Sequence, residues 1–428
     1  NGLIHSKNMK VHVGFIVFLG LVCGFRANAQ SVISLDVLYG ELKSHHPAHN
    51  LYKIQKSITN QQKKINKESN LPQANVTGQA TWQSEVTKIP FSFPGIDIPT
   101  PPKDQYRTVL ELSQSLYDGG ASKSMSKQID EQANLEMANT DLTIYSMKEN
   151  ICKAYYGAIT ADLAVDQLNL LIADLGQKES LLASQIKEGI ASGYQSAVLK
   201  VKLMEARQSK DETIKQKQNA IQVLNTLTGM HLTTDTKFND HSPSKSEPRP
   251  EYRIFDSQRK LSMALYEANK TRFNPRVQAF SQLGYGRAGL NLLTNDFRGY
   301  SILGLRGSWN LSNFYLKHSN KEKEILQKNL SKIQVQQESF GLQQKIKTDQ
   351  LKNDMANYQS LIKQDEEIII LFDTVLKSSA VRLEQGISNI NEYTTDANNL
   401  AQAKIKKSIH ETLLLQTTEL LNLIQSKE

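Results

Sequence analysis

The sequence predicts a mixed α and β fold, mostly α, built as an internal twofold repeat of helix, β-hairpin, long helix and short helix. Three observations predict this fold. Proline-marked segments recur at a fixed offset, heptad-spaced apolar residues run through each half, and short alternating segments precede those runs. Repeat 1 covers about 30–235 and repeat 2 about 236–428.

Composition sets the limits. The chain has 428 residues, 39% of them apolar, which is enough for a core and excludes wholesale disorder. With 22 Gly and 11 Pro it is not collagenous. A mean hydropathy of −0.46 excludes a polytopic helical membrane protein but is compatible with a β-barrel, in which only alternate residues are apolar.

The first 29 residues have the pattern of a secretory signal peptide. Lys10 supplies the positive start, residues 13–25 form an apolar run, and residues 27–29 (Ala-Asn-Ala) form a small-residue cleavage site. Two alternatives are an uncleaved anchor and a lipoprotein lipidated on Cys23, although the residues before Cys23 match a lipobox poorly. Residues 1–8 lie upstream of a natural start, as in an expression or gene-prediction artefact.

Cleavage after residue 29 would leave Cys152 as the one cysteine, so no intrachain disulfide is expected. It would also lower the net charge from +8 to +5, because it removes three basic residues and no acidic one. No basic run interleaved with aromatic residues occurs, which argues against a nucleic-acid partner.

The repeat is marked by prolines and glycines. Pro47 and Pro250 are 203 residues apart, and the next proline pair keeps that spacing. Gly189 and Gly386 are 197 apart, so about six residues are inserted or deleted between the strands. A Pro/Ser-rich linker over 241–248 joins the halves.

Each half contains the same series of elements. In repeat 1 we expect a helix between the two prolines, strands over about 74–86 and 104–116, a long helix over about 120–188 and a short helix over about 195–230. In repeat 2 we expect strands over about 276–287 and 299–311, a long helix over about 315–385 and a short helix over about 391–426.

The long helices carry a heptad seam. Spacings of three and four residues connect Ile144, Met147, Ile151, Ala154, Ala158, Ala161, Val165, Leu168, Ile172 and Leu175. The seam returns 197 residues later as Met355, Tyr358, Ile362, Asp365, Ile369 and Phe372, with one acidic member. This pattern predicts supercoiled packing against neighbouring helices, and an ordinary coiled-coil rod would show it too.

The strands alternate apolar and polar residues, as in Leu303, Leu305 and Trp309 against Gly304, Arg306 and Ser308. Transmembrane β-strands and a soluble sheet covered on one side both show this pattern. The export signal favours the membrane. Because four strands cannot close a barrel and membranes forbid open edges, two, three or four chains would have to pool 8, 12 or 16 strands. The proline-rich segment 89–102 would then be an external hairpin loop.

Catalytic and cofactor motifs are not found. The sequence has no G-x-S-x-G, H-E-x-x-H or Walker loop. The histidine cluster of His45, His46 and His49 straddles Pro47 at a helix start, where a surface role is favoured over a metal site. Cys152 lies beside the seam and suits packing. We therefore expect no enzyme, metal or cofactor.

At this point the chain resembles the TolC-like outer-membrane efflux protein family. The strand exit Leu116-Tyr117-Asp118-Gly119-Gly120 is similar to the family's L-[FY]-D-G-G turn into the long helix, and the segments 186–190 and 383–387 are similar to its helix tips. The second strand exit, over 309–314, departs from the pattern because it lacks the Asp-Gly pair.

The resemblance implies a homotrimer in the bacterial outer membrane, with a shared 12-stranded β-barrel and a long periplasmic coiled-coil α-barrel. The function it implies is a passive exit duct of a tripartite efflux pump for small molecules. Its partners would be a periplasmic membrane-fusion adaptor and an inner-membrane transporter, either of the resistance-nodulation-division type or an ATP-binding exporter. Type I protein secretion and, in a different class, a periplasmic coiled-coil adaptor or scaffold are the alternatives.

The resemblance also assigns residues. Channel-gate positions near the start of the last helix fall on Glu392, Thr395 and Asp396, and the alternative for Glu392 is a helix-start acid favoured by the helix dipole. The turn glycines Gly189 and Gly386 would be adaptor-docking tips and helix stops.

The strand-to-helix turn falls on Leu116, Asp118, Gly119 and Gly120. Trp82 and Trp309 suit a membrane-interface belt, and core burial is the alternative for both tryptophans.

Overall fold

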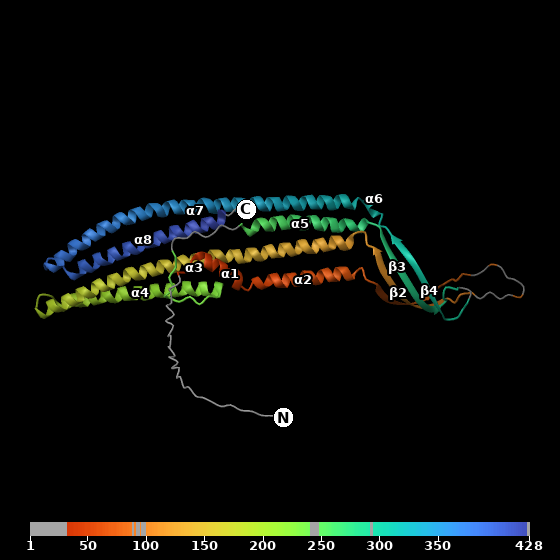
Figure 1. Ribbon diagram of the computed structural model, residues 1–428, viewed down its shortest axis with the longest axis horizontal. Helices are drawn as coiled ribbons and strands as arrows, with labels where there is room; N and C mark the ends of the chain where they lie inside the picture. Colours follow the sequence, from red (N-terminus) through yellow and green to blue (C-terminus); the bar gives the residue numbers. More distant parts are fainter. Residues whose placement is uncertain are drawn as a thin grey trace, which may run out of the picture.

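A computed structural model describes residues 32–87, 90, 95, 100–239, 248–291 and 294–425. The molecule is elongated, with a sheet at one end of a long helical body (Figure 1). The expected signal peptide with Cys23, most of the proline-rich loop and most of the linker lie outside the described residues.

The described elements follow the expected order in both halves. In repeat 1 they are α1 (Leu35–His45), α2 (His49–Glu68), β1 (Gln73–Trp82), β2 (Asp104–Tyr117), α3 (Ala121–Lys187) and α4 (Gly193–Thr228). In repeat 2 they are α5 (Pro250–Lys270), the 3-10 turn η1 (Thr271–Phe273), β3 (Arg276–Arg287), β4 (Arg298–Ser308), α6 (Ser312–Leu316), α7 (His318–Glu384) and α8 (Ile390–Gln425). The predicted fold class, mostly helical with four antiparallel strands, is confirmed.

Three boundaries differ from those expected. The first strand ends at Trp82 instead of about 86, because its partner begins at Asp104 and the register stops there. The last strand ends at Ser308 instead of about 311, and the long helix that follows starts at His318 instead of about 315. Here the side chain of Asn310 accepts a hydrogen bond from the Ser312 amide and turns the chain into the one-turn helix α6.

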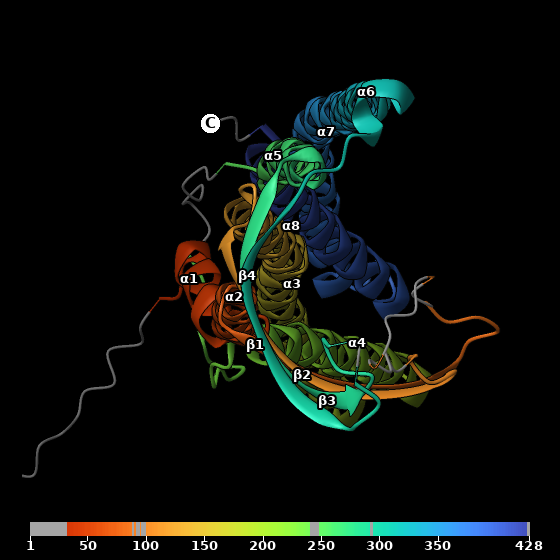
Figure 2. The same cartoon turned by 90° about the vertical axis from the view of Figure 1, so that its right-hand side faces the viewer.

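The four strands form one antiparallel sheet in the order β1-β2-β3-β4. The pair β2–β3 joins the two repeats, and Leu110 lies opposite Leu283 in it. Both β1 and β4 are edge strands, with no partner among the described residues on their outer sides. In the view from the sheet end the sheet is a curved band (Figure 2).

The two long helices are equal in length and unequal in burial. Each has 67 residues, and their bounds differ by 197 at both ends. Seventeen residues of α3 are buried against four of α7. The reason is that α3 packs against α2, α4, α5 and α8, whereas α7 packs mainly against α5 and α8.

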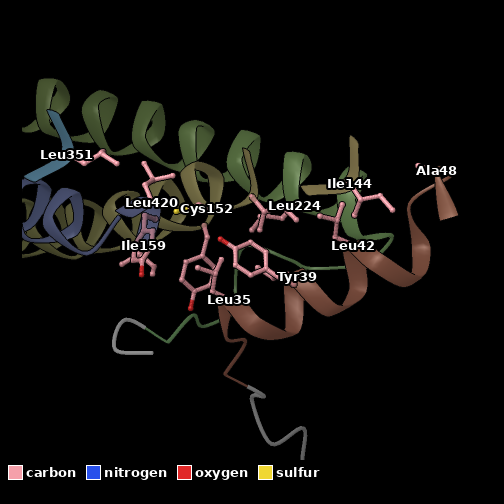
Figure 3. Close-up of a cluster of buried hydrophobic side chains, with 14 residues drawn as sticks. Leu35, Tyr39, Leu42, Ala48, Ile144, Cys152, Ile159, Leu224, Leu351 and Leu420 are labelled. Carbon is pink, nitrogen blue, oxygen red and sulfur yellow. The ribbon is translucent and has the colours of Figure 1, made fainter. Parts of the chain in front are cut away.

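Two clusters of buried apolar side chains hold the helical body together. The central cluster brings Leu35, Tyr39 and Leu42 of α1 against α3, α4, α7 and α8 (Figure 3). The second cluster lies toward the helix ends and joins Leu171 and Leu175 of α3 to Leu199 of α4 and Tyr393 of α8. Both clusters contain residues of α3, α4 and α8, and α3 has seventeen buried residues, so its seam forms a large part of the core.

The acidic member of the second seam has a specific partner. Asp365 on α7 is 4% exposed, and its carboxylate is 2.5 Å from the Nδ1 atom of His410 on α8. The His410 ring also stacks on Tyr358, one heptad step before Asp365. A polar pair therefore replaces an apolar contact at this position of the α7–α8 seam.

Candidate functional site

The helix tips are two matched turns at the end of the body that is far from the sheet. In the first turn, which joins α3 to α4, Gly189 has φ 76° and the Ile190 amide donates to the Gln185 carbonyl at 2.9 Å. In the second, which joins α7 to α8, Gly386 has φ 71° and the Ile387 amide donates to the Arg382 carbonyl at 2.9 Å. These are helix stops of the left-handed glycine type.

The tips also expose apolar side chains. Ile190 is 70% exposed and Ile387 is 67% exposed, each directly after its glycine. A β-carbon at either glycine would meet nothing within 4 Å, so the positive φ alone requires glycine there. The two turns therefore present a similar small, partly apolar surface twice in one chain.

The structure places Glu392 at the start of α8. The side chain of Asn389 accepts a hydrogen bond from the Glu392 amide at 3.1 Å, as an N-cap does. The Glu392 carboxylate accepts a hydrogen bond from Ser388 at 2.5 Å and lies 2.8 Å from the Arg382 guanidinium. Glu392 is thus a helix-start acid with a cationic partner.

The other two predicted gate positions lie one turn further along α8. The Thr395 hydroxyl donates to the Asn391 carbonyl at 2.8 Å, and its side chain is exposed. Asp396 is half-buried. Neither residue contacts the other repeat through a hydrogen bond or ion pair given by the structure.

A contact between the repeats lies beside these positions, and sequence analysis missed it. The Tyr393 hydroxyl on α8 donates to the Asp174 carboxylate on α3, 2.7 Å from both oxygens. The Lys178 ammonium lies 5.0 Å from the Tyr393 ring centroid and 3.4 Å from the Glu384 carboxylate on α7. Burial, followed by the Asp174 hydrogen bond, raises the pKa of Tyr393 above its usual value, so the hydroxyl stays protonated and donating at neutral pH.

The sequence offered little indication of this contact. Tyr393 follows Glu392 in the sequence, but its partners lie more than 200 residues away, and one sequence contains no information on such a pairing.

The predicted strand-to-helix turn of repeat 1 is formed by the residues named for it. One carboxylate oxygen of Asp118 accepts from the Gly120 amide at 2.8 Å and the other from the Ser122 amide at 2.7 Å, which satisfies two amides at the start of α3. Gly119 and Gly120 have φ 70° and 86°. A β-carbon on Gly119 would lie 2.7 Å from that of Asn274, so glycine is required here for two reasons, the positive φ and the lack of space for a side chain. Leu116 is 59% exposed.

In the corresponding turn of repeat 2, a side-chain oxygen of asparagine takes the place of the aspartate carboxylate. Asn313 accepts a hydrogen bond from the Ser319 amide at 2.7 Å, and Ser319 is the counterpart of Ser122 at the 197-residue offset. The residue before α7, Lys317, has φ 51°, a left-handed conformation without glycine. The missing Asp-Gly pair is therefore replaced by Asn313 and the extra turn α6.

The two tryptophans lie at opposite ends of the sheet. Trp82, at the end of β1 far from the helices, is 72% exposed. Trp309, next to the helices, is 57% exposed, donates to the Phe273 carbonyl at 3.0 Å and packs edge-on against Phe314. Neither tryptophan is in a core.

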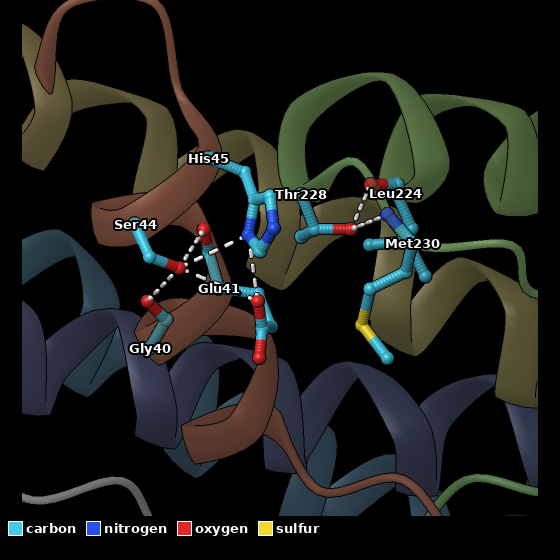
Figure 4. Close-up of polar contacts among 7 residues, drawn as sticks. All are labelled: Gly40, Glu41, Ser44, His45, Leu224, Thr228 and Met230. Carbon is cyan, nitrogen blue, oxygen red and sulfur yellow. Dashed lines mark hydrogen bonds and ion pairs between the residues drawn. The ribbon is translucent and has the colours of Figure 1, made fainter. Parts of the chain in front are cut away.

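The histidine cluster is divided among local contacts. His45 Nδ1 lies 2.7 Å from the Glu41 carboxylate and 3.0 Å from the Ser44 hydroxyl, near the end of α4 at Thr228 (Figure 4). His46 Nδ1 accepts from the Ala48 amide. Within the described part of the chain no group of three or more His, Cys, Asp or Glu side chains could hold a metal ion.

Cys152 is buried, and burial raises the pKa of its thiol well above the usual range, which disfavours the nucleophilic thiolate. No helix among the described residues combines the length and the apolar character needed to cross a membrane.

No family model matches the sequence, and no curated protein matches it closely enough to be counted as a relative. Solved structures match nearly all of the chain. The CmeC outer membrane channel of Campylobacter jejuni is 12% identical with a TM-score of 0.61, over 92% of this chain and 85% of that chain. The MtrE outer membrane channel of Neisseria gonorrhoeae, in its open state, is 15% identical with a TM-score of 0.60, over 92% and 88%.

The outer membrane protein VceC of Vibrio cholerae is 12% identical with a TM-score of 0.59, over 92% of this chain and 95% of that chain. At these identities the match shows the fold. The chain has the TolC-like fold of these outer-membrane proteins, and the resemblance in fold predicted from the sequence is confirmed.

Proposed function

On the premise of this fold, we propose that the chain is an outer-membrane channel, the passive exit duct of a tripartite efflux pump. In this proposal three copies share one 12-stranded barrel in the bacterial outer membrane, and their helices form a hollow cylinder in the periplasm. A periplasmic adaptor docks at the helix tips, and an energised inner-membrane transporter supplies the small-molecule cargo.

The observation that carries the proposal is that the contacts between repeat 1 and repeat 2 are not repeated on the outer side of repeat 2. Repeat 1 contacts repeat 2 through β2–β3 in the sheet and through α3 with α5 and α8 in the body. Repeat 2 has the corresponding elements β4 and α7, which pair with β3 and pack against α5 and α8, but no described element of this chain covers their outer sides. The next copy's β1, α2 and α4 are the matching partners, because they are the repeat-1 counterparts of β3, α5 and α8.

Exposed apolar side chains support that pairing. On α7 the exposed residues include Val335, Leu342, Ile346, Ile370 and Leu371, each at least 52% exposed. The helices that would cover them expose Ile54 and Ile65 on α2 and Val201 and Met204 on α4. In this pairing the exposed apolar side chains of α7 would be covered by those of the next copy's α2 and α4, as expected for an interaction face.

The sheet has the height of a membrane. Aromatic side chains lie near both of its ends, with Trp82 and Tyr106 at one end and Tyr117 and Trp309 at the other. Tyr106 and Tyr117 are 11 residues apart on β2, which is about 36 Å along a strand and, at a tilt of about 40°, about 28 Å in height. The lipid-facing band of outer-membrane barrels is about 25 Å tall.

The helical body is long, as a duct that extends away from the membrane requires. At 1.5 Å per residue, the 67 residues of α3 extend about 100 Å. For the gate we keep a ring of Glu392 carboxylates near the tips, with Thr395 and Asp396 as further gate positions. We add the Tyr393–Asp174 contact as a link that would have to break if the two repeats separate there.

The register inside the chain predicts the register between copies. The first strands of the repeats are offset by 203 residues and, by their pairing partners, the second strands by 195. The internal pair Leu110–Leu283 therefore maps onto Leu305 of one copy opposite Ala80 of the next.

A cysteine cross-link tests the proposal. The double variant Ala80→Cys/Leu305→Cys should oxidise to a covalent trimer in isolated outer membranes, since cross-strand neighbours have β-carbons about 5 Å apart. The matched control Ala80→Cys/Gly304→Cys places the second thiol on the opposite face and should not link. A chain that fractionates with the inner membrane or soluble periplasm, or that scatters light as a monomer in detergent, contradicts the proposal.

A further inference from the structure

The charged side chains of the sheet lie mostly on one face. Residues directly opposite each other in antiparallel strands share a face, and the register places Arg107 in one row with Gln79, Gly286 and Arg298. The face defined by this row is the polar one and carries Arg107, Glu111, Arg276, Arg298 and Arg306. The opposite, apolar face carries Asp104 and Arg287.

On the apolar face the two charges neutralise each other. A guanidinium nitrogen of Arg287 lies 3.1 Å from both carboxylate oxygens of Asp104. The pair lies at the end of the sheet that is far from the helices, and it leaves no net charge on the face that would meet lipid.

On the polar face the balance is positive. Its single carboxylate, Glu111, lies 3.4 Å from Arg306, whose guanidinium also rests 4.6 Å from the Phe280 ring centroid. Arg107 donates to the neutral amide of Gln79 at 2.8 Å. Four arginines against one glutamate leave a net charge of +3 on this face of the four strands, all of whose residues are described.

The row at the far end of the sheet has the strongest excess. It contains Arg107 and Arg298 and no acidic residue on any of the four strands. Between them Gly286 has no side chain, and a β-carbon there would lie 2.9 Å from that of Arg107. The carboxylate facing Arg298, Asp296, precedes β4, lies 3.6 Å away and is 75% exposed. The row therefore holds two cations, on the strands on either side of Gly286, where the strands approach too closely for a further side chain.

We propose that the pore through the shared barrel is electropositive and selects anions, so that the exported cargo is a class of anionic small molecules. This inference rests on the proposed function, because the polar face lines a pore only when copies close a barrel. Three copies would give the strand lining a net charge of +9, with six arginines in the outermost row.

The physical basis is a charged ring within low-dielectric walls, which concentrates counter-ions. At physiological ionic strength the screening length is about 8 Å and at 1 M salt about 3 Å, so the selectivity should weaken as salt is raised.

Reversal potentials in planar bilayers measure this selectivity. With purified trimer and a KCl gradient, the chloride-to-potassium permeability ratio should exceed one at low salt and approach one at high salt. Arg107→Gln/Arg298→Gln, which lowers the net charge from +3 to +1 per chain, should reduce the ratio. Glu111→Gln should raise it, and this opposite shift cannot come from a misfolded barrel. The control Arg287→Gln removes one positive charge at the same end of the sheet from the apolar face and should leave the ratio unchanged.

The outcomes separate the two proposals. A conducting trimer whose ratio is at or below one, or whose ratio does not move in Glu111→Gln and Arg107→Gln/Arg298→Gln, overturns the anion selectivity and leaves the channel intact. A folded protein that inserts into no bilayer and conducts no current refutes the proposed function itself.

Discussion

Replacement of Tyr393 by phenylalanine tests whether the repeats separate at the tips when the proposed channel opens. Tyr393 belongs to repeat 2 and Asp174 to repeat 1, and their hydrogen bond is one of the few polar links between the repeats at this end. The phenylalanine ring keeps the packing of a side chain that is 3% exposed and removes only the hydroxyl.

The magnitude follows from the kind of hydrogen bond. A bond to a charged acceptor contributes about 1.5–3 kcal/mol. If opening breaks this bond and closing forms it, its loss shifts the closed–open equilibrium by that amount, which is about 10- to 150-fold per chain. In the proposed trimer the effect would be multiplied if the three tips move together.

Single-channel recording measures the shift directly. We expect Tyr393→Phe to increase the fraction of time in the high-conductance state, with an unchanged conductance of the fully open state. The matched control is Tyr194→Phe, the same change beside the first tip on a side chain that is 76% exposed, and it should behave as wild type. An open fraction in Tyr393→Phe equal to that of wild type, in a protein with wild-type thermal stability, refutes the reasoning and locates opening between copies.

Three further predictions concern the gate, the strand exit and the body. Glu392→Ala should raise conductance and weaken block by multivalent cations, whereas Arg382→Ala, which frees the same carboxylate, should strengthen that block; unchanged block in both variants would remove Glu392 from the gate. Gly119→Ala should lower the melting temperature more than Gly120→Ala, because both add about 1–2 kcal/mol of left-handed strain but only Gly119 meets Asn274 at 2.7 Å; the reverse order would contradict this account. Burial tends to raise the pKa of Asp162, but hydrogen bonds from Lys217 and Lys237 outweigh it and hold that pKa below its usual value. A carboxyl group whose pKa is lower in the folded than in the unfolded state adds stability above the unfolded-state pKa, and this stability is lost as the pH falls. Asp162→Asn should therefore reduce the free energy of unfolding by about 1–3 kcal/mol at pH 7, and the difference from wild type should vanish in acid. A difference that stays constant with pH would rule out this linkage.

The sequence predicted the elements because their causes are local. The heptad seam from Ile144 to Leu175 is buried or half-buried throughout, since a period of 3.5 residues keeps one face of a helix turned to its neighbours. The alternation on the strands and the glycines at 119, 120, 189 and 386 work over a few residues, and the four glycines have positive φ in the structure.

The errors also came from local detail that the pattern did not contain. The extra turn α6 depends on Asn310 and Asn313 accepting backbone hydrogen bonds, a choice among several that an Asn-rich segment allows. The helix α1 precedes the first repeat proline and was not expected as a separate element.

Of the predicted site residues, the strand exit and the tips could be read from sequence because each is a single turn with its own hydrogen bonds. The gate stays a prediction. Spacing from Gly386 leads to Glu392, but the contacts of Glu392 are local, whereas the link to repeat 1 is made by the next residue, Tyr393.

The sequence by itself determined that this protein is a duplicated helix and strand-pair chain, because periodicity and turn chemistry act between near neighbours. The tertiary structure decided which partners meet: Tyr393 with Asp174, Asp365 with His410, and Arg306 with Glu111. It also decided that α3 is enclosed while α7 and the edge strands are left uncovered. These pairings bring together residues 45 to 219 positions apart, and they form only when tertiary packing places the helices and strands side by side.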